Sequence, residues 1–143
     1  MSRPRFVVLA SGRGSNFAAI AREVSEGRLS AELVGLLTDK PGAGALEIAR
    51  AHGVPTSVVE APGKSQGSLE ERRREQDRRV LEALQAWKPQ FLVMAGYMRG
   101  VTPLLLDAFR SPRGYTRIVN VHPSLLPAFP GVESYAQAFA HGA

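Results

Sequence analysis

The chain has 143 residues, of which 44% are hydrophobic and 22% charged, and it contains no cysteine. This length favours one domain, over residues 1–143, with a sizeable core. The lack of cysteine excludes disulfides and thiolate metal sites, and the three scattered histidines predict no metal centre. Neither a membrane span nor a signal peptide is evident in the sequence. We therefore expect a cytoplasmic protein with no membrane association.

The balance of charge is basic, with 18 lysines and arginines against 13 acidic residues. Such a balance favours anionic partners, either nucleic acid or small molecules. The basic residues are interleaved with glutamates and no aromatic-plus-basic surface motif is present. We expect small anionic molecules and no nucleic acid, although compositional bias explains much of the arginine equally well.

The first expected element is a buried strand over residues 5–10, which leads into Ser11-Gly12-Arg13-Gly14-Ser15-Asn16 and a helix over residues 17–26. A strand, a glycine loop and a helix N-terminus form an anion site, because unpaired backbone N–H groups and the helix dipole face the ligand. Ser15 or Asn16 is equally explained as the helix N-cap.

The same loop makes a poor dinucleotide fingerprint, because the third glycine of G-x-G-x-x-G falls at Phe17. Asp39, at the end of the next strand, keeps that alternative open. The loop better suits a single phosphate group.

Strands and helices alternate along the rest of the chain. Further strands are expected over residues 32–38, 56–59, 90–95 and 116–122, and helices over 45–52, 68–88, 102–109 and 133–141. This alternation predicts the α/β class: a doubly wound, Rossmann-like, mainly parallel sheet of about five strands with right-handed crossovers.

The long helix is expected to begin with a capping box at Ser68 and to end before Pro89. Its second half carries an apolar stripe, whereas its first half is almost entirely charged. A solvated face is the usual explanation for its arginines, which are Arg72, Arg73, Arg74, Arg78 and Arg79.

The last expected strand turns polar at its carboxyl end. Alternation places Asn120 and His122 on the same side, and Pro123 ends the strand on the histidine. Ligands bind beyond the carboxyl ends of parallel strands, where an amide and an imidazole could stabilise an oxyanion and transfer a proton. A histidine that merely caps a strand is the alternative. Convergence with the glycine loop and the Met98-Arg99 loop favours an enzyme.

Three stretches carry a resemblance: residues 10–16 around the glycine loop, Met94-Ala95-Gly96-Tyr97-Met98-Arg99, and the N-V-H-P-S-L-L-P run at 120–127. Together they resemble the glycinamide ribonucleotide formyltransferases, a folate-dependent family of purine biosynthesis, from about Val7 to Gly142. The last stretch is highly specific to folate formyl-group enzymes. The glycine loop separates the family from methionyl-tRNA formyltransferases and formyltetrahydrofolate deformylases.

The resemblance implies formyl transfer from the co-substrate 10-formyltetrahydrofolate to the amine of glycinamide ribonucleotide. It implies that Asn120 polarises the formyl oxygen and that His122 is the general acid. It also implies that the ribonucleotide phosphate is held by Gly14, Ser15 and Asn16. The implied folate-binding residues are Arg73, Met98, Arg99, Gly100, Val101 and Asn120. Partners would then be these small molecules, and the protein a monomer or homodimer.

The sequence departs from the family pattern at three places. Gly100-Val101 replaces bulkier aliphatics and predicts a thinner wall of the folate pocket. Glu133-Ser134-Tyr135 stands where histidine is frequent. The acidic partner of the histidine lies beyond Ala143 in the family, so we expect a chain truncated at its C-terminal end rather than a degenerate relative. A non-catalytic phosphate-binding module and another folate formyl-group enzyme remain the alternatives.

Overall fold

The structure is a computed structural model that describes residues 3–98 and 100–121. Its strands are β1 (Arg5–Leu9), β2 (Glu32–Thr38), β3 (Thr56–Val58), β4 (Phe91–Met94) and β5 (Ile118–Asn120). Its helices are α1 (Ser15–Ser25), α2 (Gly44–Ala51), α3 (Leu69–Leu84) and α4 (Pro103–Ala108), with a short 3-10 helix at Lys64–Gln66. The strands form one five-stranded sheet in the order β3-β2-β1-β4-β5.

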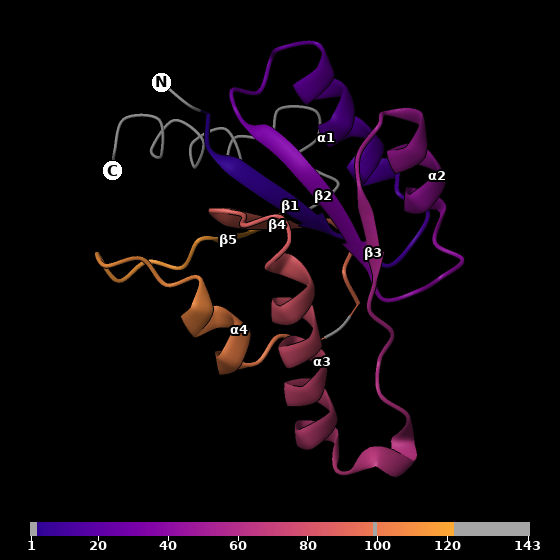
Figure 1. The fold of residues 1–143 in the computed structure, drawn as a ribbon, viewed down its shortest axis with the longest axis vertical. Coiled ribbons are helices and arrows are strands. Elements are labelled where there is room, and N and C mark those ends of the chain that lie inside the picture. The colour runs from indigo at the N-terminus through magenta and orange to yellow at the C-terminus, as the bar shows by residue number, and fades with distance from the viewer. Residues whose placement is uncertain (1–2, 99, 122–143) are drawn as a thin grey trace.

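Every strand pair in this sheet is parallel, and helices cover both faces (Figure 1). Side chains of β1 alternate between two cores because successive residues of a strand point to opposite faces. Phe6 and Val8 pack with α1 and α2, whereas Val7 and Leu9 pack with α3 and α4. All four side chains are fully buried. The predicted α/β class with a parallel, doubly wound sheet is therefore confirmed.

The capping box of α3 is also confirmed. The Ser68 hydroxyl oxygen accepts a hydrogen bond from the Glu71 N–H, and the Glu71 carboxylate accepts one from the Ser68 N–H, both at 3.1 Å. These hydrogen bonds favour the ionised carboxylate, so they lower the pKa of Glu71. The helix therefore starts one residue after Ser68, as the sequence predicts.

Part of the charged stretch of α3 is a solvated face that carries ion pairs. Arg78 contacts Glu75 at 2.8 Å and Glu82 at 3.1 Å, and Arg79 contacts Glu75 at 2.8 Å. The two arginines lower the pKa of Glu75 to about 2 through these hydrogen bonds. For Arg78 and Arg79, the expected solvated face is confirmed.

The last part of the chain differs from its expected pattern. We predicted a strand over residues 116–122, whereas β5 covers Ile118–Asn120. Thr116 instead forms an isolated antiparallel bridge with Arg110, which turns the chain before the strand begins. The predicted helix over residues 133–141 lies outside the described residues. Among the described helices, none combines the length and the apolar character that crossing a bilayer requires.

A close contact between β2 and the segment that follows α3 gives a test of this packing. A Cβ atom on Gly35 would lie 2.5 Å from the Trp87 ring, so Gly35→Ala forces the indole or the strand to move. Overpacking of this kind costs about 1–3 kcal/mol, and we expect Gly35→Ala to lower the free energy of unfolding by that amount in urea titrations. Gly42→Ala, where a Cβ meets open space, is the control. Equal unfolding midpoints for the two variants would contradict the packing described here.

Candidate active site

The carboxyl ends of three neighbouring strands lie level with one another. Leu9 of β1 is in register with Met94 of β4, and Met94 is in register with Asn120 of β5. The ladder extends one residue further, because the Val121 N–H donates to the Met94 carbonyl at 2.9 Å. We call this row the carboxyl edge. It places the segments that follow β1, β4 and β5 next to one another, as the sequence predicted.

A buried serine joins two of these segments. The Ser11 hydroxyl oxygen accepts a hydrogen bond from the Met98 N–H at 2.7 Å, and the Ser11 N–H donates to the Gly96 carbonyl at 3.2 Å. Ser11 is only 2% exposed. The glycine loop and the loop after β4 are thus held together across 87 residues of sequence. Sequence reasoning assigned Ser11 no role, because its partner is distant along the chain.

The glycine loop ends at a helix start that carries no side-chain cap. Gly14 is the N-cap of α1, with φ of 90° in the left-handed region, and α1 begins at Ser15. The N-cap explanation of Ser15 or Asn16 is therefore wrong, because Gly14 occupies that position. The first N–H groups of a helix have no intrahelical partner, so this turn presents donors at the carboxyl edge.

Gly14 is also required by packing. A Cβ atom there would lie 2.6 Å from Cα of Ala45, at the start of α2. One on Gly44 would lie 2.5 Å from the Arg13 carbonyl oxygen. The loop is therefore clamped against α2, which fixes the direction of its N–H groups.

Two other residues considered in the sequence have simple positions. Asp39, on which the dinucleotide alternative depends, is only 5% exposed, directly after β2. His52 is exposed at the C-cap of α2, as expected for a residue at a helix end. The described residues contain no group of three or more His, Asp or Glu side chains that could hold a metal.

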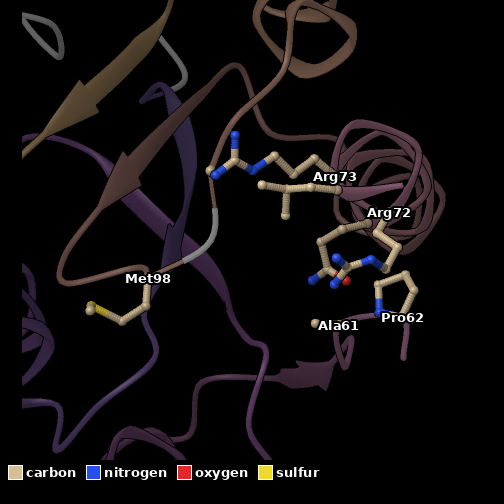
Figure 2. A pocket seen from close by; sticks show the side chains of 8 residues that line it. Ala61, Pro62, Arg72, Arg73 and Met98 are labelled. Atoms are coloured by element: carbon tan, nitrogen blue, oxygen red, sulfur yellow. The ribbon is translucent and has the colours of Figure 1, made fainter. Parts of the chain in front are cut away.

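A hollow of about 200 Å³, which we call the arginine pocket, lies between α3 and the loop after β4. Figure 2 shows Arg72 and Arg73 extending from α3, with Met98 on the loop opposite and Pro62 below. The residues that line this pocket include four folate-site candidates or their neighbours: Arg72, Arg73, Met98 and Gly100. Met98 is 70% exposed, so its thioether is available for contact with a ligand. The structure thus places the predicted Arg73, Met98 and Gly100 around one hollow.

Gly100 does more than thin the pocket wall. A Cβ atom at Gly100 would lie 3.0 Å from Nε and 3.3 Å from Cζ of Arg73. The missing side chain therefore leaves the space in which the Arg73 guanidinium lies. In the sequence, Gly100-Val101 replaces the bulkier aliphatics of the family. The space that an aliphatic side chain at position 100 would fill is occupied by the Arg73 guanidinium.

The role of Gln76 was not predicted from the sequence, because this residue stands among charged residues. It is 2% exposed, and its side-chain N–H groups donate to the Val59 carbonyl at 2.8 Å and to the Tyr97 hydroxyl at 3.2 Å. These bonds tie α3 to the ends of β3 and of β4 behind the arginine pocket. The helical period could have indicated its burial, because Gln76 precedes Val80 and Leu84 at intervals of four, on the buried face of the helix.

Asp77 was missed for the same reason. Its Oδ2 accepts hydrogen bonds from the Thr102 N–H at 2.7 Å and the Thr102 hydroxyl at 2.6 Å. The Thr102 hydroxyl oxygen in turn accepts from the Leu104 N–H at 3.2 Å and caps α4. Asp77 is fully buried, and burial raises the pKa of its carboxyl, against the opposing effect of Thr102. This carboxylate therefore fixes the end of the loop that contains Gly100 and Val101.

The remaining predicted residues fall into two groups. Asn120 is exposed at the carboxyl end of β5, beside the segments just described, and Val101 is half-buried before α4. Arg99 and His122 lie outside the described residues. The structure therefore positions the amide of the predicted catalytic pair at the carboxyl edge.

Comparison with known proteins shows the family to which this chain belongs. The family model described as formyl transferase matches residues 4–143. The chain belongs to the formyl transferase family. It is 38% identical over 138 residues to phosphoribosylglycinamide formyltransferase of Bacillus subtilis (strain 168), covering 96% of this chain and 65% of the relative. With the enzyme of the same name from Escherichia coli (strain K12), identity is 32% over 136 residues, covering 95% and 59%.

Solved structures agree with this assignment. Glycinamide ribonucleotide transformylase 1 from Geobacillus kaustophilus superimposes with a TM-score of 0.67 at 37% identity, over 99% of this chain and 69% of that one. The chain thus has the formyltransferase fold and spans about two-thirds or less of the length of the two curated relatives described above.

The buried Asp77 predicts a pH dependence of stability. A carboxyl whose pKa is raised by folding contributes stability that is fully present below its unfolded pKa, about 3.9, and is lost as pH rises through the folded value. Asp77→Asn removes this group. We therefore expect the wild-type free energy of unfolding to fall relative to that of Asp77→Asn as pH rises from about 4. Urea titrations over a pH series measure the difference.

Thr102→Val supplies the matched control. It removes a hydrogen bond that lowers the pKa of Asp77, so the pH window over which stability is lost should move upward. Parallel stability curves for the wild type and Asp77→Asn would show that Asp77 titrates alike in the folded and unfolded states.

Proposed function

We propose that the protein transfers the formyl group of 10-formyltetrahydrofolate to the amine of glycinamide ribonucleotide. The observation that carries the proposal is the carboxyl edge, where the glycine loop, the Met98 loop and Asn120 lie side by side. The names of the curated relatives support the same reaction. A phosphate-binding module would need only the first of these three features.

The phosphate of the ribonucleotide would bind at the glycine loop. Gly14 is the N-cap of α1 and Ser15 and Asn16 are its first residues, with no side-chain cap, so their backbone donors and the helix dipole favour an anion. The clamp of Gly14 against Ala45 keeps the donors oriented before the substrate arrives. Preorganisation of this kind lowers the entropic cost of binding.

The folate would occupy the arginine pocket and the adjoining edge. Arg73 supplies a guanidinium for a tail carboxylate, and Met98 an apolar surface for the ring system. Arg99, Gly100 and Val101 complete the same loop, as the family resemblance implies. Because Arg72 also lines the pocket, we include it as a second cation.

The chemistry needs an oxyanion stabiliser and a proton donor. The substrate amine attacks the formyl carbon, and negative charge develops on the formyl oxygen, to which the Asn120 amide would donate. When the carbon–nitrogen bond to the folate breaks, its nitrogen needs a proton, which His122 as general acid would supply. The attacking amine loses one proton, and return of that proton to His122 would restore the general acid, so bonds and protons balance over the transfer.

The proposal includes small-molecule partners, a cytoplasmic site of action, a single domain over residues 1–143 and a monomeric or homodimeric state. Pairing of Arg78 and Arg79 with Glu75 supports the exclusion of nucleic acid, because it neutralises part of the basic run on α3. Another folate formyl-group enzyme is the alternative, and substrate competition with glycinamide ribonucleotide distinguishes the two.

The phosphate site is tested by titration with inorganic phosphate and with glycinamide ribonucleotide. We expect the amide resonances of Gly14, Ser15 and Asn16 to shift most in isotope-labelled protein, because their N–H groups face the anion. Gly53, a left-handed glycine after the C-terminal end of α2, serves as the internal control. If the three amides stay in place while others respond, the loop is only a turn.

The catalytic pair is tested by substitution. His122→Ala should reduce formyl transfer by about 10²–10⁴-fold, the usual contribution of a positioned acid. Asn120→Ala should cost about 10²–10³-fold, as loss of an oxyanion donor does. His52→Ala, at the exposed end of α2, should leave the rate unchanged. The assay follows release of tetrahydrofolate spectrophotometrically, and a His122→Ala rate close to that of the wild type would refute the assigned role.

A further inference from the structure

The loop after β4, which carries the residues from Met98 to Val101, is held by two different parts of the molecule. Helix α3 holds it through Gln76 and Asp77. The glycine loop holds it as well, through Ser11. A residue of the segment proposed for the phosphate therefore supports the loop proposed for the folate.

Ser11 contacts the loop after β4 at two points. Its backbone N–H donates to the Gly96 carbonyl at 3.2 Å, and its hydroxyl oxygen accepts from the Met98 N–H at 2.7 Å. Gly96 lies two residues after the end of β4 and has φ of 77°, in the left-handed region, so the chain turns there. The two hydrogen bonds span this turn and fix the backbone from which the exposed Met98 side chain projects.

The two hydrogen bonds differ in what they require of the residue at position 11. The bond to Gly96 uses the backbone N–H, which almost every amino acid has. The bond to Met98 needs an oxygen on a short side chain, and Ser11 is only 2% exposed, so water has little access to replace it. Loss of the hydroxyl would leave the Met98 N–H without its acceptor in a partly buried place, which costs free energy and frees the loop.

The proposed phosphate site is fixed by other contacts. At the start of the glycine loop, the Ala10 N–H donates to the Leu37 carbonyl of β2 at 3.0 Å. At its end, Gly14 packs closely on Ala45 of α2. None of these contacts uses the Ser11 hydroxyl, so removal of that hydroxyl should leave the N–H groups at the start of α1 in place.

We propose that Ser11 is a positioning residue for the folate, although it stands in the segment proposed for the phosphate. Its hydroxyl holds the Met98 N–H and thereby sets the loop that forms one wall of the arginine pocket. The inference rests on the proposed function, because it assumes that a folate contacts this loop. Sequence position alone would assign Ser11 to the phosphate, so the two assignments predict opposite results.

Steady-state kinetics of the full-length protein separate the two assignments. Ser11→Ala should raise KM for 10-formyltetrahydrofolate about tenfold or more, because a misplacement of about 1 Å can cost on the order of 10²-fold. KM for glycinamide ribonucleotide should change by less than about twofold, since the groups that bind it stay in place. A loss of stability alone would not divide the two substrates in this way.

Hydrogen exchange of the Met98 amide tests the hydrogen bond itself, without substrate. In Ser11→Ala this amide should exchange at least about tenfold faster than in the wild type, because its acceptor is gone. The Ala95 amide is the internal reference, since it donates to the Leu9 carbonyl at 2.9 Å in the strand ladder and should keep its protection. Equal acceleration at both amides would indicate general loosening and contradict the positioning role.

Ser111→Ala is the matched control variant. Ser111 is 8% exposed, and its hydroxyl accepts the Arg113 N–H at 3.2 Å in the turn before β5. This variant also removes a buried serine hydroxyl that accepts a backbone N–H, but outside the proposed site. It should leave both KM values and the exchange of the Met98 amide unchanged.

The kinetic outcomes are distinct. A rise in KM for glycinamide ribonucleotide alone would return Ser11 to the phosphate site and overturn the inference. Equal rises for both substrates, or no change in either, would also overturn it, while transfer by the wild type would leave the proposed function intact. Absence of transfer by the wild type would refute the proposed function, and this inference with it.

Discussion

The level register of β1, β4 and β5 is the constraint on which the rest of the structure depends. Backbone hydrogen bonds between parallel strands set Leu9, Met94 and Asn120 side by side, so three loops begin at the same edge. A shift of one residue in β4 would turn its side chains to the opposite core and move Met98 away from Ser11. Burial of both sheet faces makes such a shift costly, because every β1 side chain from Phe6 to Leu9 is fully buried.

Helix α3 connects this sheet to the arginine pocket through polar groups. Gln76 reaches the ends of β3 and β4, and Asp77 holds Thr102 at the start of α4. A buried polar group without a hydrogen-bond partner costs free energy. These contacts therefore favour one arrangement of the surrounding segments. The arginines on the exposed side of α3 are consequently presented from a fixed support, which suits recognition of a carboxylate more than a mobile loop does.

The sequence was sufficient for the fold class and for the prediction that the glycine loop, the Met98 loop and Asn120 lie at one edge of the sheet. Apolar strands, glycine turns and the Ser68 cap are local signals, and all of them operate within a few residues. The roles of Gln76 and Asp77 were not predictable in this way, because their partners are 17 to 25 residues away and the neighbouring arginines mask the buried face. Ser11 posed the same difficulty over a longer separation. The helix start at Gly14 depends on contact with Ala45, a tertiary feature that loop composition does not reveal.

The clamp between the glycine loop and α2 also limits how this site can change in evolution. Gly14 and Gly44 each face backbone atoms of the other segment at distances that exclude any side chain, so neither can diversify without separating two helices. Gly12 borders open space, and Arg13 is exposed. New preferences for the proposed phosphate ligand would therefore arise first at residues 12 and 13. Divergent descendants of this chain should keep the two clamped glycines while their neighbours vary.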